Sequence, residues 1–387
     1  MTASAPLVVV SGYYGFGNMG DEAVLAGLVD AFRAAVPNIV LAVASAEPEA
    51  TRAMHGVEAF DRFSWQEFRA QVRDCTAFVS GGGSLFQDVT SRRSIYYYLG
   101  TVAMAHFYRR PVMVCAQGIG PIAAAPARAV TAALLNRAAL ITVRDPTSIT
   151  TLTSLGVSRP PVHLTADPVF ALTPASVEEA DLLLRREGVD LETPRVAFAL
   201  RAWPPRFEVA DGRHRPPDPD PRQAERERLV EAAAQAAAFV HRELRAQPVF
   251  IPMHPPGDRD LARAVAHRAG VPVVFLSGGY PPREMLALFG RMDLVVGMRL
   301  HALIFAAAQG VPVVGISYDP KVDGFLETVG RTSAAELTSI TGDALVAALR
   351  HAWDSREEEA ARLRERASVL RCKAFENGLL LRELLCV

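Results

Sequence analysis

The chain has 387 residues, of which half are apolar and 21% are charged; this is long enough for two domains, and the composition excludes a disordered or fibrous protein. Its 41 lysines and arginines balance 42 aspartates and glutamates, so it lacks the basic excess that nucleic-acid-binding proteins need. We therefore expect a globular protein with no nucleic-acid partner.

The apolar runs and the cysteines favour a cytoplasmic location. The run at residues 7–10 is too short for the core of a signal peptide. No segment approaches the ~20 apolar residues that span a bilayer. The four cysteines include no C-x-x-C pair, which indicates a reducing compartment and no metal site.

In the first half of the chain, short runs of apolar residues alternate with helical patterns. The runs are at residues 7–10, 39–44, 76–81, 111–118 and 140–145. Because they are continuously apolar, they predict parallel strands that helices cover on both faces. We expect a Rossmann-like α/β lobe over residues 1–172.

A second series of the same kind predicts a second Rossmann-like lobe with a parallel sheet. Its runs are at residues 195–201, 246–253, 271–277, 294–299 and 311–318. We expect this lobe over residues 173–387, including a C-terminal helix from Ser355 onward. The stretch 204–222 is rich in Pro, Asp and Arg and has no period, which predicts a long exposed loop, either a lid or a tolerated insertion.

The loop at residues 12–22 follows the first predicted strand and contains G-x-G-x-x-G from Gly15 to Gly20. This spacing is typical of a loop that binds a dinucleotide pyrophosphate. However, Asp21 and Glu22 open the next helix and would repel that anion, so we reject an oxidoreductase. Asp21 then either serves sugar hydroxyls as ligand or base, or caps the helix.

Three consecutive glycines follow the third predicted strand. Gly82 and Gly83 let a ligand approach the backbone closely, and Asp88 lies in the same loop. Asp88 is either a ligand-binding carboxylate or an ordinary helix-surface residue. Arg144 ends a later strand, where it can hold a carboxylate or phosphate, or bridge to Asp145 or Asp167.

The loops after residues 294–297 and 311–318 carry cationic side chains. Arg299 and His301 open a helix whose first N–H groups have no partner within the helix, which makes an anion site. Lys321 follows the neighbouring strand. This clustering predicts an anionic substrate, most plausibly a phosphate.

Taken together, these motifs resemble the polysaccharide pyruvyl transferases, in particular the CsaB-type branch. The matching segments are GYYGFGNMGDEA, GGGSLFQDVTS, AQGIGP, VRDPTS, ADPVFAL, MRLHALIFAA and YDPKV. They run from Gly12 to Val322 and cover most of the chain. One departure is Ala116, where the family more often has glycine.

The resemblance implies a two-lobed fold of the GT-B type and a transferase that needs no cofactor. The pyruvyl group of phosphoenolpyruvate would move onto two sugar hydroxyls as a 4,6-ketal, with release of phosphate. In the CsaB-type branch, the implied acceptor is N-acetylmannosamine of a lipid-linked secondary cell-wall polysaccharide, and the product anchors S-layer proteins through their SLH domains. A lipid-linked acceptor would bring the enzyme transiently to the membrane. Helix faces rich in Ala and Leu leave a homo-oligomer open.

The resemblance also maps the phosphoenolpyruvate site onto Arg299, Leu300 and His301 of the second lobe, with Arg144 and Lys321 assisting. In our hypothesis the two arginines hold carboxylate and phosphate. Lys321 neutralises the leaving phosphate, and His301 transfers a proton because the unperturbed pKa of a histidine lies near neutrality.

The acceptor is expected on the first lobe, with Asp21 as the preferred base. Its candidate residues are Tyr14, Asn18, Asp21, Gly82, Gly83 and Asp88. Helix capping and packing explain most of these residues nearly as well.

Two rival functions stay open. One is a nucleotide-sugar glycosyltransferase or epimerase that holds a nucleotide diphosphate at residues 299–301, and the other is a non-catalytic glycan-binding protein.

Overall fold

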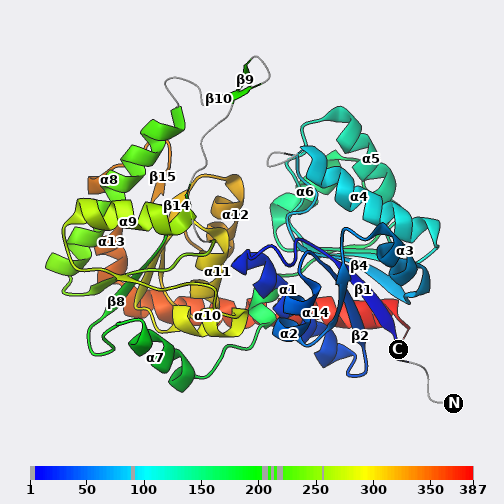
Figure 1. Ribbon diagram of the computed structural model, residues 1–387, viewed down its shortest axis with the longest axis horizontal. Helices are drawn as coiled ribbons and strands as arrows, with labels where there is room; N and C mark the ends of the chain where they lie inside the picture. The colour runs from blue at the N-terminus through cyan, green and yellow to red at the C-terminus, as the bar shows by residue number, and fades with distance from the viewer. Residues whose placement is uncertain are drawn as a thin grey trace. The chain divides into compact units, whose positions relative to one another are not determined.

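A computed structural model describes residues 5–88, 92–202, 208–210, 213–215, 221–254 and 257–386. Its chain divides into two compact units (Figure 1). The first comprises residues 1–173, 281–283 and 368–387, and the second comprises 174–280 and 284–367. The expected second lobe included residues 368–387, whereas in the structure this segment packs within the first unit.

The first unit contains a seven-stranded parallel sheet with the strand order β3-β2-β1-β4-β5-β6-β7. Its strands are β1 (Leu7–Ser11), β2 (Val40–Ser45), β3 (Glu58–Asp61), β4 (Ala77–Gly83), β5 (Val112–Gln117), β6 (Leu140–Val143) and β7 (Val162–Leu164). Its helices are α1 (Met19–Ala35), α2 (Pro48–His55), α3 (Trp65–Asp74), α4 (Arg92–Phe107), α5 (Ala125–Leu135), α6 (Pro146–Ser154) and the short η1 (Pro168–Ala171).

Helices cover both faces of this sheet. Alternate strand residues such as Val9 and Phe78 pack with α3, α4, α5 and α6 in one buried cluster. On the other face, α1 lies so close to β4 that a Cβ atom at Gly82 would be 2.0 Å from Val24. The continuously apolar strands are therefore explained by burial on two sides.

The last turns of α14 (Arg356–Leu384) also pack in the first unit. The Asn377 side chain is fully buried, and its Oδ1 accepts hydrogen bonds from the hydroxyls of Thr142 at 2.6 Å and Thr165 at 3.1 Å. Its amide nitrogen donates to the Ala374 carbonyl at 3.0 Å. A buried amide with satisfied donors and acceptors fixes this helix in one position on the sheet.

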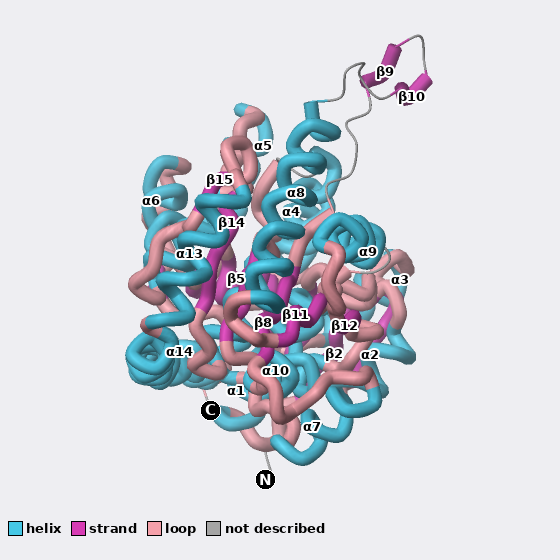
Figure 2. The backbone as a smooth tube through the Cα atoms, turned by 90° about the vertical axis from the view of Figure 1, so that its left-hand side faces the viewer, coloured by secondary structure: helices cyan, strands magenta, loops and turns pink. Residues whose placement is uncertain are grey.

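The second unit contains a six-stranded parallel sheet with the order β12-β11-β8-β13-β14-β15. Its strands are β8 (Arg195–Ala199), β11 (Gln247–Phe250), β12 (Val274–Phe275), β13 (Leu294–Gly297), β14 (Val313–Ser317) and β15 (Ala335–Glu336). Its helices are α7 (Val177–Arg186), α8 (Pro221–Arg242), α9 (Gly257–Ala269), most of α10 (Pro282–Gly290), α11 (Leu300–Ala308), α12 (Pro320–Thr328), α13 (Gly342–Asp354) and the beginning of α14. The expected α/β fold with two parallel sheets is confirmed (Figure 2).

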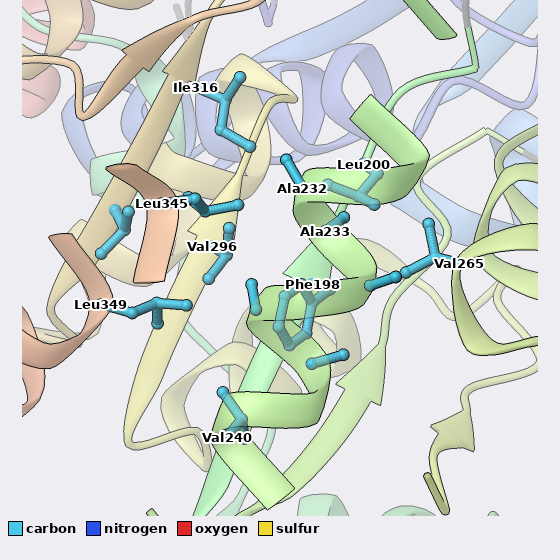
Figure 3. Packing of buried hydrophobic residues seen from close by; sticks show 14 of the residues in the cluster. Phe198, Leu200, Ala232, Ala233, Val240, Val265, Val296, Ile316, Leu345 and Leu349 are labelled. Carbon is cyan, nitrogen blue, oxygen red and sulfur yellow. The ribbon is translucent and has the colours of Figure 1, made fainter. Parts of the chain in front are cut away.

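The core of the second unit lies between its sheet and three helices. Phe198 of β8 and Val296 of β13 point toward α8, and Leu345 of α13 closes the same cluster (Figure 3). On the opposite face, two glycines without side chains let the helices pack closely on the strands. A Cβ atom at Gly297 would lie 2.5 Å from a leucine of α11, and one at Gly315 would lie 2.5 Å from a leucine of α12. Both helices that begin at the cationic loops are therefore packed directly on the strands that precede them.

Part of the predicted loop at residues 204–222 forms a short antiparallel hairpin of β9 (Glu208–Ala210) and β10 (Arg213–Arg215). Residues 203–207, 211–212 and 216–220 lie outside the described part of the chain. The prediction of a lid falls on this segment and stays a prediction. Within the described ranges, no helix is long and apolar enough to cross a membrane.

Each sheet has one point where the strand order reverses. In the first unit it lies between β1 and β4, and in the second between β8 and β13. In open parallel sheets, ligands bind at the carboxyl ends of the strands beside this point. The two glycine loops follow β1 and β4, and the loop with Arg299 follows β13, so the topology gives each unit one candidate site.

Candidate functional site

The β1–α1 loop of the first unit is held by a buried carboxylate. Gly15 and Gly17 have positive φ angles of 79° and 69°, which glycine adopts without strain. The Gly15 N–H donates to Glu22 Oε1 at 2.8 Å, and the other oxygen of Glu22 is 3.0 Å from His55 Nε2. Glu22 and His55 are both buried. This pair fixes the path of the loop.

The helix cap in this loop is Asn18, not Asp21. The Asn18 side chain accepts from the Gly20 N–H at 3.2 Å, as an N-cap residue does. The Asp21 carboxylate lies instead beside the glycine loop, where a Cβ atom at Gly83 would be 3.2 Å from Asp21 Oδ1. Asp21 is therefore not the N-cap residue of α1, and its role as ligand or base stays a prediction.

Tyr14 is a core residue in this structure. Its side chain is 1% exposed, and burial raises its pKa well above the usual range of a phenol. The ring lies against Gly12 and Gly81, where an added Cβ atom would approach it within 2.3 Å and 2.8 Å. The aromatic ring that we expected at the acceptor site is thus enclosed by the sheet and its loops.

The glycine run after β4 has a packing role as well as an open backbone. Gly82 faces Val24 of α1, whereas Gly83 has a φ of 92°. Gln117 supports this run from β5, because its buried amide donates to the Gly81 carbonyl at 3.0 Å and accepts from the Leu85 N–H at 3.1 Å. Gln117, from the AQGIGP segment, therefore supports the glycine run.

Next to Gln117, Ala116 adopts a left-handed backbone with a φ of 47°. Such a conformation is unfavourable for a residue with a Cβ atom. This geometry is a physical reason for glycine at the position where the sequence departs from the resembling family.

Asp88 serves the loop before α5. Its carboxylate accepts from the N–H groups of Ala123 at 2.9 Å and Ala124 at 2.8 Å. Asp88 lies before α4 and is therefore not the helix-surface residue of our second interpretation, and these bonds give it a structural role that the sequence did not indicate. Its role in ligand binding stays a prediction.

Arg144 forms a buried ion pair in the first unit. Its Nη1 is 2.6 Å from Asp167 Oδ2, and its Nη2 donates to Ser84 Oγ at 3.1 Å. Asp145 instead caps α6 by accepting from the Ser148 N–H. Arg144 therefore lies beside the glycine loop of its own unit, whereas the other expected phosphoenolpyruvate ligands belong to the second unit.

In the second unit, Arg299 is held by a carboxylate that the sequence analysis missed. Arg299 precedes α11, and its Nη2 is 2.6 Å from Asp258 Oδ1. Asp258 is 2% exposed and also accepts from the N–H groups of Ala202, Met253 and His254. Four donors at one buried carboxylate orient the guanidinium. The sequence could have indicated Asp258 as a site residue, because it comes just after the loop that follows β11.

The neighbouring strand ends carry further cations. Arg201 follows β8, donates to the Tyr318 hydroxyl at 2.6 Å and lies 4.9 Å from the centre of that ring. Lys321 begins α12 after β14, and its Nζ is 3.4 Å from Asp319 Oδ2. Because β8, β13 and β14 are adjacent, Arg201, Arg299 and Lys321 come from three consecutive strand ends.

Leu300 and His301 form the first turn of α11, where Leu300 is buried and His301 is partly exposed. The structure thus gathers four of the predicted residues, Arg299 to His301 and Lys321, along one sheet edge.

No group of three His, Cys, Asp or Glu side chains suited to a metal ion occurs among the described residues.

Comparisons with known proteins agree with this architecture. A family model described as polysaccharide pyruvyl transferase matches residues 18–320. No curated protein matches the chain.

Several solved structures have a similar fold. HepE from Anabaena in complex with UDP-glucose is 13% identical, with 98% of this chain and 99% of that chain covered and a TM-score of 0.62. MnaA from S. aureus with UDP is 10% identical, with 98% and 96% covered and a TM-score of 0.65. The UDP-GlcNAc 2-epimerase from Neisseria meningitidis bound to UDP-GlcNAc is 11% identical, with 99% and 100% covered and a TM-score of 0.61. At these identities the likeness concerns the fold alone.

Proposed function

Because the chain belongs to the polysaccharide pyruvyl transferase family, we propose that it transfers the pyruvyl group of phosphoenolpyruvate onto two hydroxyls of a saccharide and releases phosphate. One observation above all supports phosphoenolpyruvate as the donor. It is the row of cationic side chains at the strand-order reversal of the second unit. Arg299 and Lys321 follow adjacent strands, and α11 directs its first N–H groups to the same edge. Phosphoenolpyruvate carries a carboxylate and a phosphate, which match such a site.

The proposed reaction balances without an oxidant, a reductant or a cofactor. A proton adds to the methylene carbon of the enol phosphate, and one sugar hydroxyl attacks the resulting cationic carbon. The C–O bond to phosphate breaks, and a second hydroxyl closes the cyclic ketal. Of the two hydroxyl protons, one replaces the proton taken up by the methyl group and the other leaves with phosphate.

Each step needs a group that the chain supplies in our proposal. Arg299 holds the donor's anionic groups with the assistance of Arg144, and Lys321 neutralises the leaving phosphate. His301 gives a proton to the methylene carbon. Asp21 takes the proton from the attacking hydroxyl. The position of the Asp21 carboxylate beside Gly83 supports its role as base.

The acceptor that we propose is N-acetylmannosamine of a lipid-linked secondary cell-wall polysaccharide, pyruvylated at O4 and O6 as in the CsaB-type branch. The product would anchor S-layer proteins through their SLH domains. The resemblance in the β1–α1 and glycine loops supports this assignment. A cytoplasmic enzyme with transient access to the membrane suits such an acceptor.

The decisive experiment combines the purified protein with phosphoenolpyruvate and methyl β-N-acetylmannosaminide, which has free hydroxyls at C4 and C6. A mass increase of the sugar with stoichiometric phosphate release is expected, and Lys321→Ala should abolish it. Calorimetry measures donor binding separately. If no ketal forms and phosphoenolpyruvate does not bind, the donor assignment is wrong.

The second candidate is a nucleotide-sugar glycosyltransferase or epimerase, because the similar folds of HepE and MnaA were solved with UDP-glucose and UDP. In that case residues 299–301 would hold a nucleotide diphosphate. Calorimetry with UDP-glucose in place of phosphoenolpyruvate distinguishes the two. Tight binding of UDP-glucose that excludes phosphoenolpyruvate would favour this candidate.

A further inference from the structure

Three aromatic side chains form an exposed cluster on the first unit that its core does not explain. We call Tyr13, Phe16 and Phe63 the aromatic shelf. The Tyr13 and Phe16 rings are stacked with centroids 4.2 Å apart, and Phe63 meets Phe16 edge-on at 6.3 Å. Tyr13 is 39% exposed and Phe63 is 67% exposed. Single exposed aromatics are common, but a contiguous group is typical of a binding surface.

A buried arginine holds the shelf in place. Arg62 is 5% exposed, and its Nη1 donates to the Gly12 carbonyl at 2.8 Å. Its guanidinium carbon lies 4.9 Å from the Phe16 ring centre and 5.8 Å from that of Phe63. Because the cation is anchored to the backbone of the β1–α1 loop, the rings above it are preorganised.

The shelf borders the candidate acceptor site. Tyr13 and Phe16 belong to the β1–α1 loop, and Phe63 follows β3, so all three lie at the carboxyl edge of the first sheet. Partial burial and then the charge of Asp21 raise the pKa of Tyr13, while Arg62 lowers it. The Tyr13 phenol is therefore within electrostatic range of the Asp21 carboxylate.

A pyranose ring suits this combination of surfaces. One face of the sugar presents C–H groups, which pack on aromatic rings, and its edge presents hydroxyls, which carboxylates accept. We propose that the aromatic shelf is a saccharide subsite, on which a sugar of the polysaccharide acceptor stacks while a hydroxyl is directed to Asp21. This inference rests on the proposed function for the identity of the acceptor.

The test measures saccharide binding without phosphoenolpyruvate. The probes are β-linked di- and tetrasaccharides that contain N-acetylmannosamine, glucose or galactose. Binding to the full chain is followed by NMR saturation transfer to the sugar C–H protons and by calorimetry. The double variant Tyr13→Ala/Phe63→Ala should weaken binding of the best probe by roughly 10-fold or more. Phe107→Ala is the matched control, because Phe107 is 77% exposed on the same unit but lies outside the shelf.

Transfer kinetics separate a subsite from a general structural effect. In the double variant we expect a raised KM for the tetrasaccharide, with kcat and the midpoint of thermal unfolding close to those of the unaltered protein. Shelf-dependent binding without any pyruvyl transfer would support the subsite and count against the proposed function. Equal binding by the unaltered protein and the double variant, or binding of no probe, would overturn the subsite even if transfer occurs. A change in oligomeric state or in vesicle binding, with unchanged sugar affinity, would also overturn it.

Discussion

The two units have the same topology at their candidate sites but opposite chemistry. In each, a parallel sheet reverses its strand order, and an arginine at a strand end is 2.6 Å from a buried aspartate. In the first unit, glycines, aromatic rings and the Asp21 carboxylate lie at the same edge of the sheet as the pair. In the second, Arg201, Lys321 and the N-terminus of α11 do.

This difference shows how one scaffold serves two classes of ligand. The first unit presents an uncharged, closely approachable backbone that suits a hydroxylated ligand, and the second presents positive charge that suits an anion. The ion pairs themselves do not distinguish the two sites, because each unit has one with the same distance of 2.6 Å. Four predictions test this division, beginning with the largest effect.

Removal of the proposed proton donor should have the largest effect. His301→Ala should lower kcat for ketal formation by roughly 10²–10⁴-fold, because a positioned proton-transfer group is lost. Binding of the acceptor saccharide to the first unit should not change. Steady-state assays of phosphate release measure the effect, with His267→Ala as the exposed control on the same unit. Near-normal turnover by His301→Ala would remove His301 from the mechanism.

The second prediction concerns the Asp258–Arg299 pair. Asp258→Ala should reduce the free energy of unfolding by about 3–5 kcal/mol, because the partly buried Arg299 guanidinium and three backbone N–H groups lose their acceptor. Chemical denaturation measures this, and Asp260→Ala, at an exposed position two residues away, should change it by less than about 0.5 kcal/mol.

A second substitution sharpens this test. Asp258→Ala/Arg299→Leu should recover part of the lost stability, since the unpaired charge is gone. Failure of the double variant to recover any stability would mean that the carboxylate acts mainly through the N–H groups of Ala202, Met253 and His254.

The third prediction tests the glycine run of the first unit. Gly82→Ala should reduce the free energy of unfolding by about 1–3 kcal/mol, because its Cβ atom would overlap Val24. Gly82→Ala/Val24→Ala should be more stable than Gly82→Ala. Gly100→Ala, in α4 where an added Cβ atom meets nothing within 4 Å, should stabilise by about 0.5–1 kcal/mol. An unchanged unfolding transition in Gly82→Ala would contradict the packing role of Gly82.

The smallest expected effect is a pH dependence of the stability of the first unit, which contains all four cysteines. Burial raises the pKa of Cys115 to about 12 and that of Cys75 to about 11. Because the folded state holds these protons more tightly, their stabilising contribution is complete below the ordinary thiol pKa of about 8.5. It is lost as the pH rises toward 11–12.

Pulsed alkylation with peptide mass spectrometry measures this dependence. At pH 8 the exposed Cys372 and Cys386 should react quickly, and Cys75 and Cys115 only through unfolding. Labelling of the buried pair should accelerate as the pH rises above about 9. Equal labelling rates for all four thiols at pH 8 would contradict the burial of the pair.

Sequence reasoning identified the elements and the loops because their signals are local. The predicted strands are apolar runs, whereas the short strands β3, β7 and β15, with sequences such as EAFD and AE, were not predicted. Arg299, His301 and Lys321 are recognisable from their places after strands. The confirmed α/β fold followed from this alternation of strands and helices.

Side-chain partners could not be predicted in the same way. Asp258 meets Arg299 across 41 sequence positions, and Asn377 meets Thr142 across 235. Tyr14 looks like a loop aromatic in the sequence, yet it is enclosed because Gly12 and Gly81 leave room for its ring. Such contacts depend on how separate elements pack, which no local pattern encodes.

The docking of α14 has a consequence for the order of events during synthesis. The buried hydroxyls of Thr142 and Thr165 receive their partner from Asn377, which the ribosome adds about 200 residues after the rest of the first unit. At 5–20 residues per second, that interval is roughly 10–40 s. During this time the sheet face that α1 covers lacks the part of its cover that α14 supplies, so the unit that is translated first is completed last.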